Sequence, residues 1–384
     1  MGNWTRLAGW YAAELRNGLA ARNRIWARGK PHVESYGSSP VVVYAPYNPT
    51  DEDPSAGTPA YHPANKELSI GAIPKHGRHG NFFDASYAAI ASRPEWMRRF
   101  DKIHAQGRAL PKAEAYAHEK APRRWRELDS SMSSDALLMN VFCAPEVMGA
   151  PGVRQALGVD VDVAPVFGWK ARVPLASGRF DRTEVDMRWG GLLVEAKLTE
   201  GDFQTRAGRI VEAYRDFDAV FERELLPRVE LRAARRRTAV EFAEEYTQEW
   251  EEAATDDSVA REFQAAVVAR GREEEPAEAG YASYQLIRNV LAAHAEGCSF
   301  CVLHDARRPD LREAWYAVMA AVKTAEMQVR CKVLTWQELA GMVPDDLQEF
   351  LDLKYGIVPA GRVASALGEP AEVESSSRFP TGES

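Results

Sequence analysis

The 384-residue sequence predicts a mixed α/β fold. From residue 133 the chain reads as helix, three strands, helix, strand, helix and strand, an order typical of a sheet with helices on its faces. A strand-turn-strand pattern, EVDMRWGGLLVEAK at 184–197, forms the centre of that sheet. A continuous apolar run, CSFCVLH at 298–304, reads as a buried strand beside it.

Length and composition bound the class of protein. The chain is long enough for about two to three domain-sized units of roughly 150 residues. It is 45% apolar and 27% charged, carries a formal net charge of −8 and has four cysteines. No apolar run of about 18 residues and no secretory apolar stretch is present, so we expect no membrane span and no secretion. A cytoplasmic protein without a disulfide framework fits these features.

Residues 1–125 predict an N-terminal region of helices and loops, a candidate for substrate binding. The first segment has apolar residues at helical spacing and is expected to pack on the protein's own body: Trp4, Leu7, Tyr11, Leu15. Residues 31–80 are rich in Pro, Gly, Ser and Asn and read as loops around a strand at 41–45. Residues 81–127 read as helical.

Residues 126–352 predict the α/β core. SSDALLMNVF at 133–142 opens with residues suited to a helix N-cap, and VFGWKARVPL at 166–175 alternates like a strand. After the hairpin we expect a helical insertion at about 202–279, within which 202–270 reads as one long helical stretch. YASYQLIRNVLAAHAEG then predicts a helix that ends at a glycine. Residues 353–384 are expected to form a largely disordered C-terminal tail.

The hairpin carries an unusual set of charges. Side chains alternate between the faces of a strand, so Asp186 shares a face with Glu184 and Arg188, while Glu195 and Lys197 share a face with Leu193. The opposite face is apolar, with Val185, Met187 and Trp189 on one strand and Leu192, Val194, Ala196 and Leu198 on the other. We therefore expect Asp186, Glu195 and Lys197 to cluster.

Two clustered carboxylates repel each other unless a cation lies between them, and Mg²⁺ or Mn²⁺ suits such oxygen ligands. A lysine beside the ion would hold the attacking water and stabilise charge on a phosphate. A hairpin edge charged only to prevent aggregation explains the spacing equally well.

Asp186 followed by Glu195-Ala196-Lys197 resembles the signature of the PD-(D/E)XK nuclease superfamily, which has a restriction-endonuclease-like αβββαβ core. SSDALLMN and YQLIRN also resemble segments of restriction endonucleases in this superfamily, and the resemblance covers about 126–342. It implies that Asp186, Glu195 and the carbonyl of Ala196 bind the metal and that Lys197 acts on the water. Val185 stands where the family name has a proline.

The resemblance also implies supporting residues. Gln285, in the helix after the third strand, is the candidate to lie near the scissile phosphate, and the insertion before it could displace it. An acid from the first helix often completes the site, for which Asp135 is the candidate and Glu127 is less well placed. A helix-cap role explains the position of Asp135 equally well.

Candidate nucleic-acid contacts lie outside the hairpin. Residues 75–127 hold twelve Lys and Arg against six Asp and Glu, whereas 239–279 hold three against thirteen. A polyanion would meet the first region and avoid the second. The expected contacts come from the loop KHGRHGNFF, from RRWRE and from the Gln285 helix: Lys75, Arg78, Arg123, Arg124, Arg288. Buried Phe82 and Phe83 that pin a structural loop explain the first motif at least as well.

A zinc site at Cys298 and Cys301, with His294 and His304, is an unlikely alternative, because Cys301 points away from Cys298 on a strand. No phosphate-binding glycine loop and no Ser-His-Asp order stands out.

The sequence thus predicts a Mg²⁺-dependent or Mn²⁺-dependent endodeoxyribonuclease of restriction or phage-defence type. DNA is the expected partner, with a homodimer or a multi-protein defence complex as candidate assemblies and no membrane. Two alternatives stay open: an inactive nuclease fold that serves as a binding or interaction protein, and an RNA-directed nuclease.

Overall fold

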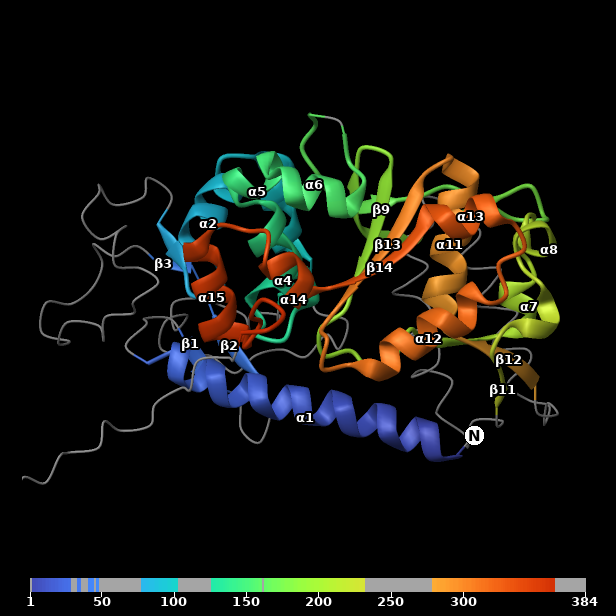
Figure 1. Ribbon diagram of the computed structural model, residues 1–384, viewed down its shortest axis with the longest axis horizontal. Helices are drawn as coiled ribbons and strands as arrows, with labels where there is room; N and C mark the ends of the chain where they lie inside the picture. The colour runs from blue at the N-terminus through green and yellow to red at the C-terminus, as the bar shows by residue number, and fades with distance from the viewer. Residues whose placement is uncertain are drawn as a thin grey trace, which may run out of the picture.

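The computed structural model describes most of the chain (Figure 1). The described residues are 2–28, 33–35, 41–44, 46–47, 77–102, 126–160, 162–231 and 278–362.

A five-stranded mixed sheet forms the centre of the molecule. Its strands are β5 (Val166–Lys170), β8 (Glu184–Trp189), β9 (Leu192–Ala196), β13 (Ser299–His304) and β14 (Cys331–Thr335), in the order β14-β13-β9-β8-β5. The first three strands form an antiparallel meander, and β13 and β14 run parallel to β9. The predicted mixed α/β fold, with its central hairpin and the buried strand beside it, is therefore confirmed.

Helices cover both faces of this sheet, so that two hydrophobic cores lie on opposite sides of it. On one face, α4 (Ser134–Phe142) packs with Val194, Ala196 and Leu303. On the other face, α11 (Tyr284–Glu296) packs with Leu193 and other residues of the second core. The Ser133 side chain caps α4 by accepting a hydrogen bond from the Ala136 amide at 3.0 Å.

Short helices complete the two layers. Next to α4 are α5 (Pro145–Gly149) and α6 (Pro151–Leu157). The chain after β13 forms α12 (Pro309–Met319), α13 (Ala325–Arg330), α14 (Trp336–Ala340) and α15 (Asp345–Tyr355).

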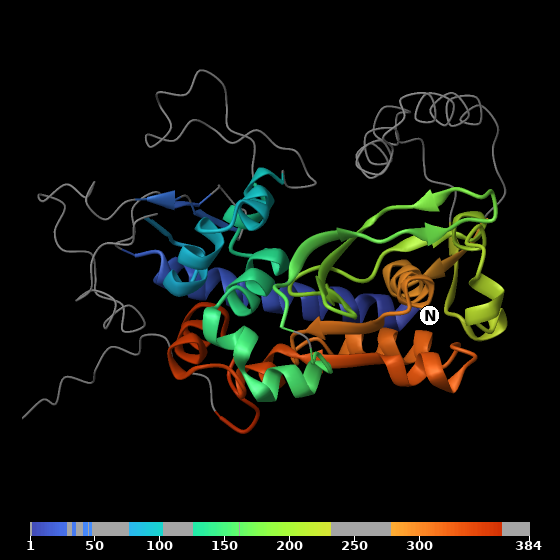
Figure 2. The same cartoon turned by 90° about the horizontal axis from the view of Figure 1, so that it is seen from above.

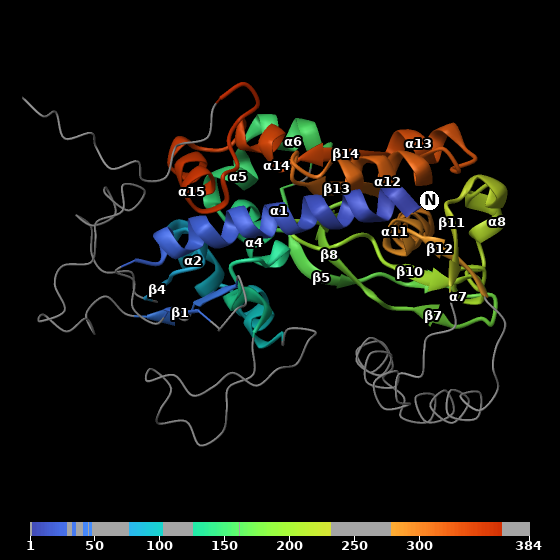
Figure 3. The same cartoon turned by 90° about the horizontal axis from the view of Figure 1, so that it is seen from below.

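The N-terminal region packs onto the α/β core. The long helix α1 (Gly2–Trp26) contacts α15 and α12 and buries Leu15 and Leu19, and Figure 3 shows it crossing the molecule from α2 to α12. Packing on the protein's own body is thus confirmed for this helix. One hydrophobic core joins Trp26 and Phe82 to Leu137, so the expected boundary near residue 125 does not divide the packing. No helix in the described residues is both long and apolar enough to span a membrane.

Short elements connect α1 to the core. They are β1 (Val33–Ser35), β2 (Val42–Tyr44), β3 (Pro46–Tyr47), β4 (Arg78–His79), α2 (Asp84–Ala91), α3 (Pro94–Met97), η4 (Arg98–Asp101) and η6 (Glu127–Asp129).

The hairpin faces follow the expected alternation in all but one position. Met187 and Trp189 share a core with the apolar residues of β9, as predicted, but Val185 packs in the opposite core. Pairing between β8 and β9 ends at Met187, and Gly168, at φ 67° on the neighbouring strand, turns the chain at this level. Period-two alternation therefore fails at Asp186, where the strands separate.

The predicted long helix from residue 202 is wrong for 202–231. This segment forms β10 (Thr205–Ala207), α7 (Gly208–Val211), α8 (Phe217–Val220), η7 (Arg223–Leu225) and β11 (Arg228–Leu231), and β12 (Glu278–Ala282) pairs between β10 and β11. Its apolar side chains Phe203, Val211, Phe217 and Phe221 all bury in the second core, which requires short turns instead of one straight helix. Residues 232–277 of the expected insertion lie outside the described residues.

The expected tail begins too early. Lys354, Tyr355 and Ile357 are each 0% exposed, and α15 ends at Gly356 with φ 64°. Tyr355 and Ile357 belong to the first hydrophobic core, because apolar side chains after the helix still reach it. Residues 363–384 of the predicted tail lie outside the described residues.

Candidate active site

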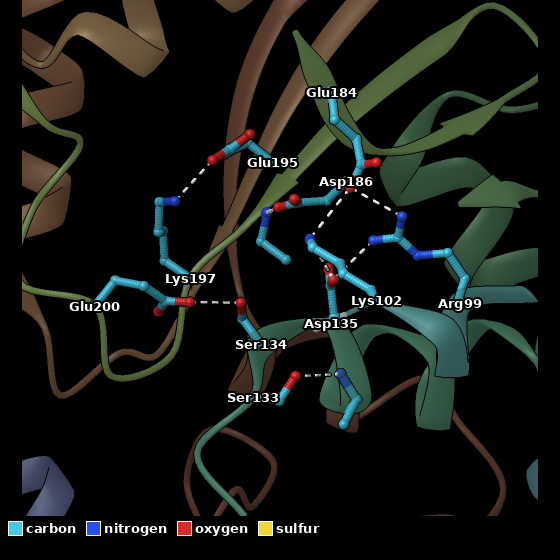
Figure 4. Close-up of polar contacts among 12 residues, drawn as sticks. Arg99, Lys102, Ser133, Ser134, Asp135, Glu184, Asp186, Glu195, Lys197 and Glu200 are labelled. Carbon is cyan, nitrogen blue, oxygen red and sulfur yellow. Dashed lines mark hydrogen bonds and ion pairs between the residues drawn. The ribbon is translucent and has the colours of Figure 1, made fainter. Parts of the chain in front are cut away.

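The candidate site lies where β8 and β9 separate (Figure 4). Their register pairs Met187 with Val194, so the next position sets Asp186 opposite Glu195. Here the backbone ladder stops, and the Ala196 amide donates instead to the Asp186 Oδ2 carboxylate oxygen at 2.7 Å. The carboxylate thus replaces a missing strand partner and is fixed beside the second strand.

Glu195 and Lys197 form a buried ion pair on β9 and the residue that follows it. Lys197 Nζ lies 2.7 Å from Glu195 Oε1, and the two residues are 5% and 3% exposed. The backbone of Lys197 is also held, because its amide donates to the Leu303 carbonyl at 2.8 Å and its carbonyl accepts from Trp336 Nε1 at 3.0 Å. The expected cluster of Asp186, Glu195 and Lys197 is present.

The charges of this cluster oppose one another. Burial, followed by Glu195 and Asp135, raises the pKa of Asp186 well above its usual value, against the smaller effect of Lys197. Burial alone would lower the pKa of Lys197, but Glu195 and other nearby carboxylates outweigh it and raise that pKa. The surroundings therefore favour the charged form of Lys197 and the neutral form of Asp186.

Asp135 lies in the first turn of α4 and is bound by two cations from the N-terminal region. Its Oδ2 accepts from Arg99 Nη2 at 2.7 Å and from Lys102 Nζ at 3.0 Å. Burial would raise the pKa of Asp135, but Lys102 and Arg99 together lower it. Because Ser133 is the N-cap, Asp135 is not a cap residue, and its charge is compensated before any substrate binds.

The same two cations reach the start of β8. Arg99 Nη1 and Lys102 Nζ lie 2.9 Å and 3.2 Å from Glu184 Oε1. A Cβ atom on Gly168 would lie 2.1 Å from Arg99 Nη1, and the residue has φ 67°. Glycine is therefore required at this position for Arg99 to approach the sheet.

Glu127 lies at the edge of the same cluster. Burial, followed by the negative charge of Asp135, raises the pKa of Glu127 to about 7, although Lys102 and a hydrogen bond from Ser133 oppose this rise. Sequence reasoning ranked Glu127 below Asp135, and the structure sets both near Lys102.

The helix α11 reaches the site with Asn289. Asn289 Nδ2 donates to Glu195 Oε2 at 2.8 Å, and the residue is 1% exposed. Gln285, the residue expected from the sequence, lies one turn earlier and is half-buried, and its side chain makes no hydrogen bond with the described residues. Sequence reasoning missed Asn289, for which the signal is a second amide four residues after the first, on the same helix face.

Arg288 supports Asn289 from behind. Its Nη1 donates to Asn289 Oδ1 at 2.8 Å, and its Nε donates to Asp181 Oδ2 at 3.1 Å. The residue is only 2% exposed. This burial argues against the predicted direct contact of Arg288 with nucleic acid.

A loop after β9 is fixed by further residues that the sequence did not single out. Glu200 accepts from the Ser134 hydroxyl and from the Leu198 amide, which ties the loop to α4. The buried Arg308 donates to the carbonyls of Glu200 and Gly201 at 2.7 and 2.9 Å. These bonds hold the chain just beyond Lys197.

The other predicted contacts lie away from this cluster or outside the described residues. Lys75, Arg123 and Arg124 fall outside the described residues. Arg78 pairs with Asp84 at 3.2 Å. Phe82 and Phe83 are 3% and 4% exposed, so the loop that follows Arg78 is pinned by buried aromatic rings.

The cysteines pack separately. Cys298 lies in the second core and Cys301 in the first, on opposite sides of the sheet, as the strand alternation predicted. Both are free and buried.

The donor set partly fits a divalent ion. Asp186 and Glu195 supply carboxylate oxygens from adjacent strands, and burial followed by the charge of Glu195 raises the pKa of Asp186. Within the described residues, no group of three or more His, Cys, Asp or Glu is gathered as a ready metal site. A two-carboxylate site completed by a backbone carbonyl and by substrate oxygens is the arrangement these residues fit.

Comparison with known proteins gives one match. A family model described as Restriction Endonuclease associating with ARP matches residues 57–356, which is most of the chain. No curated protein and no solved structure matches the chain. The family match agrees with the restriction-endonuclease-like relationship that the hairpin residues predicted.

Proposed function

We propose that the chain, which belongs to the family of restriction endonucleases associating with ARP and is thus of the restriction nuclease type, hydrolyses DNA phosphodiester bonds internally. The proposed reaction uses a divalent metal ion, Mg²⁺ or Mn²⁺. In this proposal α4, β5, β8, β9, α11 and β13 form the αβββαβ core of a PD-(D/E)XK nuclease. One observation supports it most strongly: Asp186, Glu195 and Lys197 converge where β8 and β9 separate.

The proposed metal ligands are the carboxylates of Asp186 and Glu195 and the carbonyl of Ala196. When bound, the ion would neutralise phosphate charge and lower the pKa of a coordinated water. Asp186 is oriented by the Ala196 amide at 2.7 Å, and Glu195 by Lys197 and Asn289 at 2.7 and 2.8 Å. These bonds fix both carboxylates before the ion arrives.

Lys197 is the proposed group that orients the attacking water. Its ammonium is charged and buried, and it already lies against Glu195, so it would act next to the metal. As a donor it stabilises negative charge that grows on the phosphate in the transition state. Asp135 and Gln285 remain candidate supporting residues, with Asp135 acting through its contacts with Arg99 and Lys102.

The experiment is cleavage of supercoiled plasmid, linear DNA and RNA, with Mg²⁺, Mn²⁺ or EDTA. The variant Lys197→Met keeps most of the side-chain volume and removes the charge. Its matched control is Lys323→Ala. Lys323 is exposed, lies far from Lys197 in the sequence and pairs with Glu222. We expect metal-dependent nicking by the wild type and by Lys323→Ala and none by Lys197→Met, with all three melting cooperatively.

The other outcomes are equally informative. Cleavage of RNA alone would replace DNA as the substrate. Equal cleavage by Lys197→Met and wild type would refute the assigned site. Binding without cleavage under every condition would favour an inactive nuclease fold.

The family description also names an association with ARP, and we extend it to this chain as a proposed partner. A cytoplasmic complex that acts against foreign DNA is consistent with such a partner. Co-purification of the two proteins, with and without DNA, tests this part of the proposal.

A further inference from the structure

A long β-ribbon extends from the candidate site. β6 (Val173–Pro174) and β7 (Phe180–Asp181) pair antiparallel, in the same register as β5 and β8. The two pairs thus lie in line as one ribbon, unpaired at 171–172 and 182–183 and closed by the turn at 175–179, that leads into Asp186 at its inner end. Figure 2 shows its green strands running outward from the centre of the molecule.

The two faces of this ribbon differ in chemistry. The inward positions include Ala171 and Val173, which are 0% and 1% exposed and belong to the second core. The outward positions are basic and aromatic, and each is exposed: Lys170, Arg172, Phe180, Arg182, with Arg179 in the turn. We refer to Arg172, Arg179, Phe180 and Arg182 as the ribbon patch.

Charge on this segment is unbalanced. The only acid between 163 and 182 is Asp181, and it faces inward, where it pairs with Arg288 at 3.1 Å and accepts from the Tyr214 hydroxyl at 2.6 Å. Continuing the β6–β7 register by one residue brings Arg172 level with Arg182, and like charges at opposite positions are unfavourable without a counterion. An anionic partner would relieve this repulsion.

The patch is also ordered in a way that suits binding. The Arg172 guanidinium stacks on the Phe180 ring, 4.4 Å from its centroid, which limits the conformations it must lose on binding. Asp181 ties the ribbon to Arg288, whose neighbour Asn289 contacts Glu195. The ribbon is therefore held rigidly relative to the candidate catalytic residues.

We infer that the ribbon patch binds the phosphate backbone of DNA beside the cleaved bond, an inference that rests on the proposed nuclease function. Arg182 precedes Asp186 by four residues, which an extended chain spans in at most roughly 13 Å. At about 3.4 Å for each base pair, this corresponds to roughly four base pairs of a duplex. The patch thus contacts phosphates outside the reacting one and positions the duplex without reading its sequence.

The test is binding of a fluorescent 30-base-pair duplex to the full chain in EDTA, where no cleavage occurs, over a range of NaCl concentrations. The variant is Arg172→Ala/Arg179→Ala/Arg182→Ala. Each lost phosphate contact lowers the slope of log Kd against log salt by about 0.9, so the triple variant should lower it by nearly three. Between 50 and 200 mM NaCl, the affinity of the wild type for DNA should therefore fall roughly 40-fold further than the affinity of the triple variant.

The matched control is Arg215→Ala/Arg223→Ala, which removes the exposed Arg215 and the half-buried Arg223, arginines that already pair with Asp216 and Asp218. It should leave the slope within about half a unit of wild type.

The outcomes separate this inference from the proposed function. If wild type binds DNA and the triple variant keeps its affinity and salt slope, the ribbon patch is refuted and the nuclease proposal stands. If wild type binds no DNA at any salt concentration, the proposed substrate itself fails, and the ribbon inference fails with it. Cooperative melting of the triple variant excludes unfolding as the cause of lost binding, since its three side chains are exposed.

Discussion

Replacing Asn289 with alanine should weaken metal binding at the candidate site without affecting DNA binding. Asn289 donates to Glu195 Oε2 and accepts from Arg288, both at 2.8 Å. Because Asn289 is only 1% exposed, water cannot freely take the place of its removed side chain. The variant leaves one Glu195 oxygen without its donor and Arg288 without one acceptor.

The magnitude follows from the hydrogen bond to Glu195. A hydrogen bond to a charged group contributes roughly 1.5–3 kcal/mol. A loss of about 2 kcal/mol in the orientation of a proposed metal ligand corresponds to roughly 30-fold in metal affinity, within the range of roughly 10–100-fold for residues behind a ligand. The free energy of unfolding should also fall by about 2–3 kcal/mol, which a domain of ordinary stability tolerates.

The assay is the plasmid cleavage rate as a function of Mg²⁺ concentration, together with calorimetric titration of Mn²⁺ in the absence of DNA. Asn289→Ala should need roughly 30-fold more metal to reach half-maximal rate. Asn140→Ala is the control, because Asn140 is also fully buried but bonds to the Phe83 amide instead of a site carboxylate. A folded Asn289→Ala protein with the metal dependence of wild type would show that Asn289 only stabilises the fold.

Three further predictions concern stability. Gly168→Ala should lower the free energy of unfolding by roughly 1 kcal/mol more than Gly178→Ala. Both glycines have a positive φ, which costs an alanine roughly 1–2 kcal/mol, but only Gly168 lies against Arg99. Equal losses of stability in urea melts would contradict the steric argument. Because the pKa of Glu127 is raised to about 7, ionisation of its carboxyl group lowers the stability of the fold as pH rises from about 4.5 to 7. Glu127→Gln should therefore be more stable than wild type at pH 8, by at most about 3 kcal/mol, and equally stable at pH 4. A stability gain that does not depend on pH would refute this sign. Mg²⁺ at a hundredfold its Kd should add about 2.7 kcal/mol to the stability of wild type, and EDTA or Asp186→Asn should remove that gain, as thermal melts would show.

Local patterns sufficed to predict the Glu195 and Lys197 part of the hairpin cluster, because strand alternation depends only on neighbours in the sequence. Asp186 and Glu195 meet across β8 and β9 as the pattern indicated. Arg99 and Lys102 were not predicted, because their contacts with Asp135 join residues 36 and 33 positions apart, and no local period encodes such a pair. Charge pairs between distant elements depend on the tertiary packing of α3 and η4 against β5, which a single sequence leaves open.

The contact of Asn289 with Glu195 depends on how α11 begins. Ser283 has φ 60° at the start of the helix, and the Gln285 amide donates to the Phe203 carbonyl, so the first turn is bound to the segment that follows β9. The helix therefore presents its second turn to Glu195, while Gln285 stays on the same face one turn earlier. Asn289 thus contacts the carboxylate from the second turn, and Gln285, on the same helix face, stays the predicted residue for the scissile phosphate. Every contact just named lies outside residues 232–277, so replacing that range with a short linker that keeps β11 and β12 paired should leave the metal dependence of cleavage unchanged.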